Sequence, residues 1–211
     1  MVKGQDRVKA RDQHSDKASR SCFGHYLPRL RREFYMADSV VFWTLTVHDR
    51  QTGWLNQQFH LSFRELMLHA AAREGLICPA YCLMPDHIHI VWMGLNVSTD
   101  QRSAMKFLRT YLAVALKPFT LQHQAYDRVL TEEDRIRSKF TLACVDYVLL
   151  NPWKAELVTK PEEWQFLGAM IPGYPDCHPF SAKYWPWFWQ RYTEMKKDGV
   201  ERRKLPRREM E

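Results

Sequence analysis

The chain has 211 residues, of which 45% are apolar and 26% are charged, a composition that suits one globular domain and excludes a mostly disordered chain. It contains no run near the roughly 18 apolar residues of a membrane helix, and its N-terminus is polar, so we expect a cytoplasmic protein with no signal peptide and no membrane partner. The formal net charge of +7 resides at the two ends, with +6 in residues 1–32, +3 in residues 191–211 and −2 between them, which is typical either of a nucleic-acid partner or of two solvated tails.

The first predicted elements are an arm, a strand and a helix. Residues 1–32 are polar and basic, which predicts a partly flexible arm. Residues 40–47 are β-branched and aromatic, which predicts a buried strand. Ser62 followed by Glu65 has the pattern of a capping box, so we expect a helix that begins there and ends at Gly75.

A hairpin and a second helix follow. Residues 76–84 and 87–93 predict two strands joined by a turn at Pro85 and Asp86. Residues 100–116 predict a helix that ends shortly before a proline, because the residue that precedes a proline disfavours helical geometry.

The core ends with a short strand and a long helix. We expect the strand within residues 121–130, and a helix that is capped by residues 131–134 and ends near Asn151, because Pro152 follows. The resulting order, β-α-β-β-α-β-α, matches the ferredoxin-like pattern β-α-β-β-α-β with one more helix. We therefore expect an α+β fold, a ferredoxin-like core with an added C-terminal helix.

Two histidines share one side of a predicted strand. Side chains alternate along a strand, so His87 and His89 project to one face and Ile88 projects to the other. Both faces are largely apolar, and two imidazoles in such surroundings are costly unless they are satisfied. A divalent metal ion would satisfy both at once. Two alternatives stay open: ordinary hydrogen-bonded histidines, or a structural zinc site that Cys78 and Cys82 complete.

A tyrosine and an amide lie one turn apart on the last predicted helix. An apolar stripe with helical spacing predicts its inward face, formed by Ile136, Phe140, Ala143, Cys144 and Tyr147. Asn151 follows Tyr147 by four residues and so lies on the same face. Taken alone, Tyr147 suits a core position and Asn151 suits a helix end. Together with the two histidines, Asn151 could provide a third ligand to one ion, with the Tyr147 hydroxyl about one helical turn away.

Two segments resemble a known enzyme family. Residues 84–91, MPDHIHIV, resemble the histidine–hydrophobic–histidine (HUH) motif of single-tyrosine transposases. Residues 147–158, YVLLNPWKAELV, resemble the tyrosine-helix motif of the REP-associated tyrosine transposases. The two motifs occur in the expected order, about 60 residues apart. The family commonly reads Asn-Pro-x-Arg-Ala-Gly after the tyrosine, where this chain has Lys154 and Glu156 in place of Arg and Gly.

The resemblance implies a fold, a cofactor and a reaction. It implies a ferredoxin-like catalytic domain in residues 33–170 that binds Mg²⁺ or Mn²⁺ through His87, His89 and Asn151. It implies that Tyr147 attacks single-stranded DNA at a hairpin or palindromic repeat and becomes joined to the 5′-phosphate. A 3′-hydroxyl then attacks this phosphotyrosine intermediate and rejoins the strands without ATP. Relatives act as monomers or as dimers, so a homodimer is one possibility.

Basic and aromatic residues outside the two motifs are candidates for DNA contacts. The basic candidates are Arg102, Lys106, Arg109, Lys154, Arg202, Arg203 and Lys204. The first three form one stripe on a predicted helix, which a solvated helix face explains equally well. Residues 171–211 form an aromatic-rich segment and a basic tail, and we expect the aromatic residues 184–189 to dock this segment onto the core rather than to stack on bases.

Two other functions fit parts of the sequence. A replication initiator or relaxase would use the same tyrosine chemistry, although a single tyrosine near a metal ligand suits a transposase. A ferredoxin-like module that binds nucleic acid without catalysis would read bases with aromatic residues on an exposed sheet. The alternating residues Ile88, Ile90 and Trp92 lack the glycine–aromatic motif of such RNA-binding modules.

Overall fold

The computed structural model describes residues 29–130 and 139–204 of the chain, with side chains for residues 29–130 and 141–196. In chain order, the elements of this part of the chain are η1 (Arg32–Tyr35), β1 (Val40–Thr46), η2 (His48–Arg50), α2 (Gln57–Glu74), β2 (Leu76–Leu83), β3 (His87–Gly94), α3 (Gln101–Ala115), β4 (Tyr126–Leu130), α5 (Lys139–Lys154), η3 (Pro161–Glu163), β5 (Leu167–Met170) and α6 (Tyr184–Lys204).

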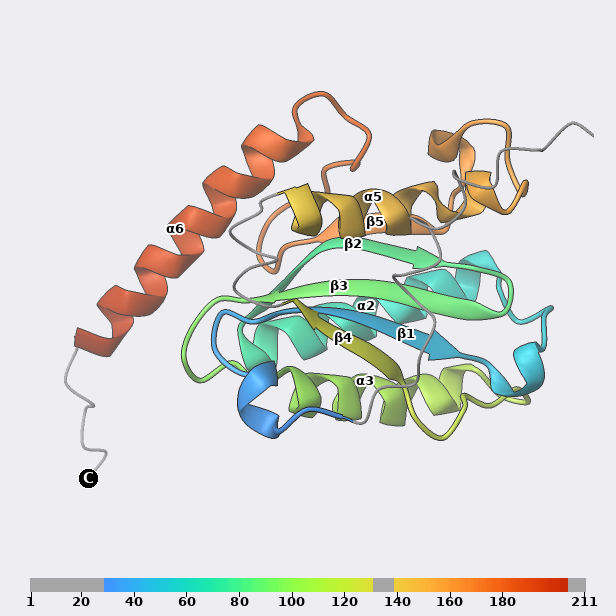
Figure 1. Ribbon diagram of the computed structural model, residues 1–211, viewed down its shortest axis with the longest axis horizontal. Coiled ribbons are helices and arrows are strands. Elements are labelled where there is room, and N and C mark those ends of the chain that lie inside the picture. Colours follow the sequence, from blue (N-terminus) through green and yellow to red (C-terminus); the bar gives the residue numbers. More distant parts are fainter. Residues whose placement is uncertain (1–28, 131–138, 205–211) are drawn as a thin grey trace, which may run out of the picture.

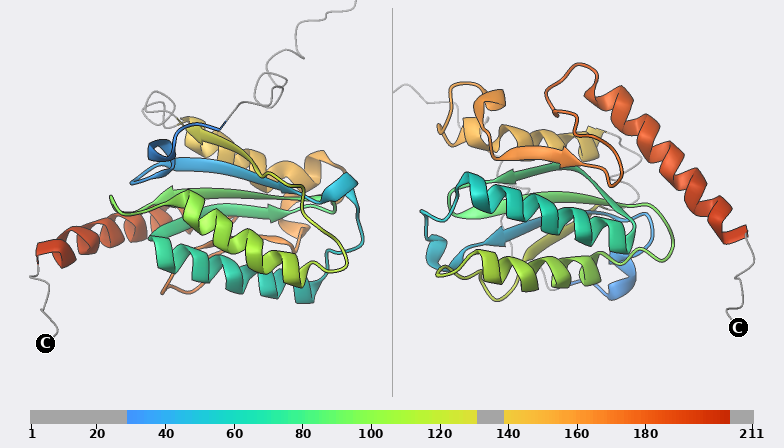
Figure 2. Two further views of the ribbon diagram at one scale, coloured as in Figure 1. Left: turned by 90° about the horizontal axis from the view of Figure 1, so that it is seen from below. Right: turned by 180° about the vertical axis from the view of Figure 1, so that it is seen from behind.

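The strands form one antiparallel sheet in the order β4-β1-β3-β2-β5. The elements β1-α2-β2-β3-α3-β4 give the ferredoxin-like arrangement. Helices α2 and α3 lie side by side over one face of the sheet, and α5 lies over the other face (Figure 1, Figure 2). The predicted α+β fold with an added helix is therefore confirmed. Besides the short helices η1, η2 and η3, the strand β5, which pairs with β2 at the edge of the sheet, and the helix α6 were not predicted.

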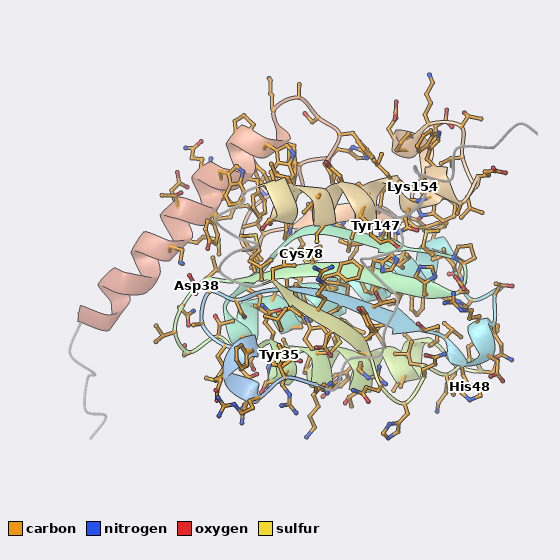
Figure 3. The ribbon with its side chains drawn as sticks, in the orientation of Figure 1. Tyr35, Asp38, His48, Cys78, Tyr147 and Lys154 are labelled. Carbon is orange, nitrogen blue, oxygen red and sulfur yellow. The ribbon has the colours of Figure 1, made fainter. Side chains whose placement is uncertain are left out.

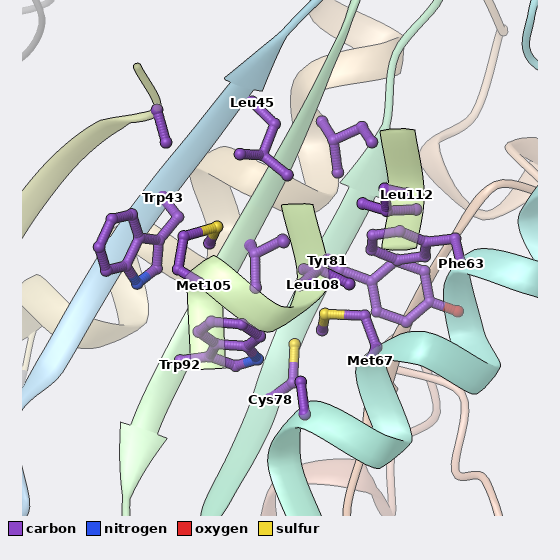
Figure 4. Packing of buried hydrophobic residues seen from close by; sticks show 14 of the residues in the cluster. Trp43, Leu45, Phe63, Met67, Cys78, Tyr81, Trp92, Met105, Leu108 and Leu112 are labelled. Atoms are coloured by element: carbon purple, nitrogen blue, oxygen red, sulfur yellow. The ribbon is translucent and has the colours of Figure 1, made fainter. Parts of the chain in front are cut away.

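The face under α2 and α3 carries a large apolar core (Figure 4). Its fully buried side chains include Trp43 of β1, Trp92 of β3, Phe63 and Met67 of α2, and Leu108 of α3. Complete burial of an apolar side chain stabilises the folded chain by about 1.5–3 kcal/mol. This face therefore fixes β3, the strand of the histidine pair, against the two helices.

Helix α2 begins earlier than the sequence predicts. Its N-cap is Asn56, whose side-chain oxygen accepts a hydrogen bond from the backbone N–H of Phe59 at 2.9 Å. Ser62 and Glu65, the predicted capping box, lie inside the helix. The earlier start is favoured because it brings a further apolar side chain, that of Phe59, into the core. The helix ends as predicted at Gly75, whose φ of +66° is a left-handed conformation that glycine adopts freely.

Helix α5 continues through Pro152, whereas the sequence predicts an end near Asn151. A proline removes one helical hydrogen bond, but the next turn still closes, with the N–H of Ala155 2.9 Å from the carbonyl oxygen of Asn151. Beyond the helix, Glu156 has a left-handed φ of +57°. The predicted cap at residues 131–134 lies outside the described residues.

The aromatic start of α6 docks onto the sheet. Tyr184 and Phe188 are fully buried, and the Tyr184 hydroxyl donates a hydrogen bond to the carbonyl oxygen of Pro79 in β2 at 2.5 Å. The predicted docking of this segment is confirmed, although Trp189 remains 38% exposed. The rest of α6 extends away from the sheet (Figure 1). In the part of the chain that is described, no helix is both long and apolar enough to cross a membrane.

Candidate active site

The histidine pair lies on β3, on the face of the sheet that α5 covers. His89 is only 5% exposed and stands in register between Thr44 of β1 and Cys82 of β2. His87 and His89 point to the same face, as the alternation predicts, and Ile88 packs in the core of the other face. Their Nε2 atoms lie 2.9 Å apart. At this distance the two nitrogens form a hydrogen bond with each other, so both rings direct Nε2 into the space between them.

The outer nitrogens of both rings are held by neighbouring residues. Nδ1 of His87 lies 2.5 Å from one carboxylate oxygen of Asp86, and the other oxygen accepts a hydrogen bond from Arg50 at 2.7 Å. Nδ1 of His89 lies 3.0 Å from the hydroxyl oxygen of Thr44. Such partners fix the orientation of histidines that bind metal ions. These three residues around the histidine pair were not predicted from the sequence. Asp86 could have been predicted as the neighbour of His87, but Thr44 and Arg50 come close to the histidine pair only in the folded chain.

Burial and hydrogen bonding set the charges of this group. The pKa of His89 is well below its usual value, first because of burial and then because of His87; Arg50 adds to the effect and Asp86 opposes it. For Asp86, partial burial alone would raise the pKa, but the hydrogen bonds from His87 and Arg50 outweigh it and lower the pKa. At neutral pH, Asp86 is therefore ionised and His89 is neutral. A neutral imidazole is the form that binds a metal ion.

The donor set fits a divalent cation. Two nitrogens that each lie about 2.1 Å from one ion, at a right angle, are about 3.0 Å apart, close to the observed Nε2–Nε2 distance of 2.9 Å. Within the described residues, no group of three or more His, Cys, Asp or Glu side chains could hold a metal ion. Further ligands would have to be amide, water or substrate oxygens. The alternative zinc site with Cys78 is wrong, because Cys78 is buried in the core of the opposite face.

Helix α5 turns a different stripe toward the sheet than the sequence predicts. The buried positions of its described side chains are Thr141, Val145, Val148, Leu149 and Pro152. Of the predicted stripe, Ala143 is exposed, Cys144 and Tyr147 are half-buried, and the side chains of Ile136 and Phe140 lie outside the described set. This buried stripe packs against β2 and β3.

Tyr147 consequently lies at the border of the buried stripe, where its ring reaches the histidine pair. The centroid of its ring lies 5.7 Å from that of His89 and 6.0 Å from that of Phe42. Phe42 in turn packs against His89, with ring centroids 5.1 Å apart. A helix residue at such a border combines packing against the sheet with partial exposure, which a group that meets a substrate requires.

Two more residues of α5 flank Tyr147, and Figure 3 labels one of them, Lys154. The side-chain N–H of Asn151 donates to the carbonyl oxygen of Tyr147 at 3.4 Å. This bond leaves out the amide oxygen, the atom that binds metal ions, and no hydrogen bond in the described residues joins Asn151 to either histidine. Nζ of Lys154 lies 5.4 Å from the centroid of the Tyr147 ring. Burial raises the pKa of Asp146, and the charge of Lys154 only partly offsets this.

The other predicted DNA contacts lie elsewhere. Arg102, Lys106 and Arg109 line a cavity of about 620 Å³ beside α3, the helix that covers the opposite face of the sheet. Arg109 donates two hydrogen bonds to backbone carbonyls of residues 122–123, at 2.6 and 3.0 Å, so it also anchors that loop. Residues 202–204 end α6, and their side chains lie outside the described set.

The turn after β1 contains strained backbone next to the site. Asp49 and Arg50 have φ angles of +53° and +51°, a conformation that costs a residue with a side chain roughly 1–2 kcal/mol. The turn is anchored by the N–H of His48, which donates to the carbonyl oxygen of Thr120 at 2.8 Å. Such strain persists only where the surrounding structure holds it. Here the strained turn places Arg50 beside Asp86.

A solved structure of known function shares this fold. No model of a known protein family matches the chain, and no curated protein matches its sequence. Among solved structures, the chain is similar to a REP-associated tyrosine transposase bound to a REP hairpin. The sequences are 21% identical and the TM-score is 0.54, over 67% of this chain and 82% of that one. At this identity the similarity establishes the common fold.

Proposed function

We propose that this chain is a metal-dependent enzyme that cleaves and rejoins single-stranded DNA, a tyrosine transposase of the HUH type. The observation that carries the proposal is the convergence of the Nε2 atoms of His87 and His89 beside the ring of Tyr147. The two sequence motifs and the fold shared with a REP-associated tyrosine transposase support it. The proposed substrate is hairpin or palindromic-repeat DNA, in line with the hairpin bound in that structure.

The proposed metal site consists of three side chains. His87 and His89 give their Nε2 atoms to Mg²⁺ or Mn²⁺, and Asn151 gives its amide oxygen. Asp86 and Thr44 keep the two rings aimed at this point. When bound, the cation supplies positive charge that stabilises the negative charge of the reacting phosphate.

Tyr147 is the proposed nucleophile. Its phenol oxygen forms a bond to phosphorus while the bond from phosphorus to the 3′-oxygen breaks, which joins the strand to the protein through its 5′-phosphate. The phenol loses its proton and the departing 3′-oxygen gains one. Attack by a different 3′-hydroxyl then restores a phosphodiester and returns the proton to Tyr147. Each step exchanges one phosphoester bond for another, so no ATP is required.

Basic residues are proposed to position the strand. Lys154 lies over the Tyr147 ring and can reach a phosphate that is bound there. Arg102, Lys106 and Arg109, beside the other face of the sheet, would hold DNA outside the catalytic centre, together with residues 202–204. Phosphate contacts of this kind position a strand without reading its sequence.

Covalent capture tests the proposal. Hairpin-ended oligonucleotides labelled at the 3′ end are incubated with the protein and Mn²⁺ or Mg²⁺, and the products are separated under denaturing conditions. We expect a labelled protein–DNA adduct that is absent in EDTA and absent with Tyr147→Phe. An adduct that survives Tyr147→Phe would place the nucleophile elsewhere, and folded wild-type protein that forms no adduct with any hairpin tested would contradict the proposal.

A matched control separates the role of Tyr147 from a general effect of losing a hydroxyl. Tyr111 is 50% exposed on α3, beside the opposite face of the sheet, and Tyr111→Phe should form as much adduct as the wild type. A DNA-binding module without catalysis would bind the oligonucleotide in every variant and form no adduct in any of them.

A further inference from the structure

Arg50 is held at the rim of the candidate site by the strained turn after β1. The backbone N–H of Val47 donates to the carbonyl oxygen of Asp86 at 3.0 Å, which ties this turn to the start of β3. Figure 3 shows His48, the first residue of the turn, beyond the end of β1. The side chain of Arg50 then meets the carboxylate of Asp86, the residue that directly precedes His87.

Most of the hydrogen-bonding capacity of Arg50 points outward. A guanidinium carries five N–H donors in a planar fork, and among the described residues only one of them has a partner, Asp86, at 2.7 Å. The side chain of Arg50 is 69% exposed, whereas that of Asp86 is 21% exposed. Asp86 thus holds the inner edge of the guanidinium and leaves its outer donors facing solvent.

We propose that Arg50 is a substrate-binding residue whose outer N–H groups bind the phosphate that is cleaved or its immediate neighbour in the strand. A planar fork matches two oxygens of one phosphate, and a charge-assisted pair of this geometry is stronger and more directional than the contact of an ammonium group. This inference rests on the proposed function, because it assigns the strand to the surface beside His87 and Tyr147. It adds a positive group to the predicted DNA contacts, since neither sequence motif includes Arg50.

Strain gives an independent reason to assign a role to Arg50. An orienting partner for Asp86 alone could come from any unstrained position within reach. Two successive residues with left-handed φ angles are instead maintained in the turn that sets the guanidinium against Asp86. Backbone strain of this kind clusters at functional sites, where the surrounding structure fixes a group in advance.

Binding of DNA without metal tests the proposal apart from catalysis. Affinity for a fluorescent single strand of twenty thymidines is measured in EDTA at several salt concentrations. Each phosphate contact contributes about 0.7 to the slope of log affinity against log salt for a single strand, so Arg50→Gln should lower the slope by about 0.7 and Arg50→Lys should largely restore it. Arg73→Gln, an exposed arginine of α2 beside the other face of the sheet, is the matched control and should keep the wild-type slope.

A second comparison separates phosphate binding from the mere orientation of Asp86. If Arg50 acted only through Asp86, Arg50→Gln and Asp86→Asn would weaken Mn²⁺ binding equally and would leave the salt slope unchanged, which would overturn the proposal. We expect Arg50→Gln to lower the slope while it changes Mn²⁺ binding less than Asp86→Asn does.

The two proposals fail in different ways. If the wild type forms the tyrosine adduct but Arg50→Gln keeps the wild-type salt slope, the role of Arg50 is refuted and the proposed function stands. If Arg50→Gln lowers the slope but no variant forms an adduct, the phosphate contact stands and the proposed chemistry fails. With cleavable DNA, a neutral methylphosphonate at the contacted position should weaken binding of the wild type and have little effect on Arg50→Gln.

Discussion

The two faces of strand β3 differ in what their side chains do. Under α2 and α3, Ile88, Ile90 and Trp92 are fully buried in an apolar cluster. Under α5, the same strand presents His87 and His89, whose ring nitrogens all have partners. Adjacent residues of one strand thus belong to a core and to a candidate active site, only because side chains alternate between faces.

The difference teaches how a sheet can carry polar groups without losing stability. The apolar face holds the strand in place, so the other face does not depend on apolar contacts at every position. Desolvation of the buried imidazole of His89 is offset by the hydrogen bond with Thr44 and the contact with His87. The second face has an apolar core of its own, which includes Val91 and Met93. Substitutions of the apolar residues of β3 should therefore reduce stability, and substitutions of its two histidines should reduce chemistry.

The largest effect should follow the loss of a histidine on the α5 face. His89→Ala removes one of the two converging nitrogens, so we expect adduct formation to fall by roughly 100- to 1,000-fold or more, as when a group that stabilises transition-state charge is lost. Single-turnover rates with the hairpin oligonucleotide measure this. DNA binding in EDTA should change little. A His89→Ala protein that cleaves at the wild-type rate would contradict the assignment of the histidine pair to catalysis.

The neighbouring position on the other face should behave in the opposite way. Ile90→Ala leaves a cavity in the core under α2 and α3, and we expect the free energy of unfolding to fall by about 2–5 kcal/mol. Urea unfolding measures the loss. The cleavage rate per folded molecule should stay close to the wild-type rate, and a folded Ile90→Ala protein that has lost cleavage would contradict the comparison.

A smaller effect should follow the loss of the hydroxyl group that holds His89 on the α5 face. Thr44→Val keeps the shape of the side chain but removes the hydroxyl that bonds Nδ1 of His89. Loss of such a partner lowers metal affinity by about 10- to 100-fold, which titration of Mn²⁺ by calorimetry would measure. Thr110→Val, at an exposed position of α3, is the control and should bind Mn²⁺ like the wild type. Equal affinity of Thr44→Val and the wild type would show that the hydroxyl does not orient the ring.

The smallest expected effect lies outside both faces, after the end of α5. Glu156 is exposed and has a φ of +57°, a position that glycine occupies without steric cost. Glu156→Gly should raise the free energy of unfolding by about 0.5–1 kcal/mol, measured in urea, without a change in adduct formation. A loss of stability instead would mean that Glu156 makes a contact worth more than its backbone strain.

The sequence was sufficient for features that depend on local periodicity. Strand alternation placed His87 and His89 on one face and Ile88 on the other, and the order of strands and helices led to the ferredoxin-like core. Both inferences hold because the period of a strand is a property of the backbone. The strand β5 has only four residues, one of which is Gly168. It is too short to show the alternation that predicts a strand.

Features that depend on contacts between distant segments could not be predicted. Thr44 lies opposite His89 only through the register of two strands, and Arg50 reaches Asp86 only through a turn with unusual φ angles. The rotation of α5 was predicted wrongly because several apolar stripes fit its sequence, and packing against β2 and β3 selects among them. Tyr147 was nevertheless expected near the histidine pair, and its ring does lie beside His89.

The most direct test of the proposed metal site is anomalous diffraction from a crystal of the protein grown with Mn²⁺. We predict one peak about 2.1 Å from the Nε2 atoms of both His87 and His89, with the amide oxygen of Asn151 turned toward it and the Tyr147 hydroxyl beside it. A peak at other residues, or no peak between the two rings at saturating Mn²⁺, would contradict the account.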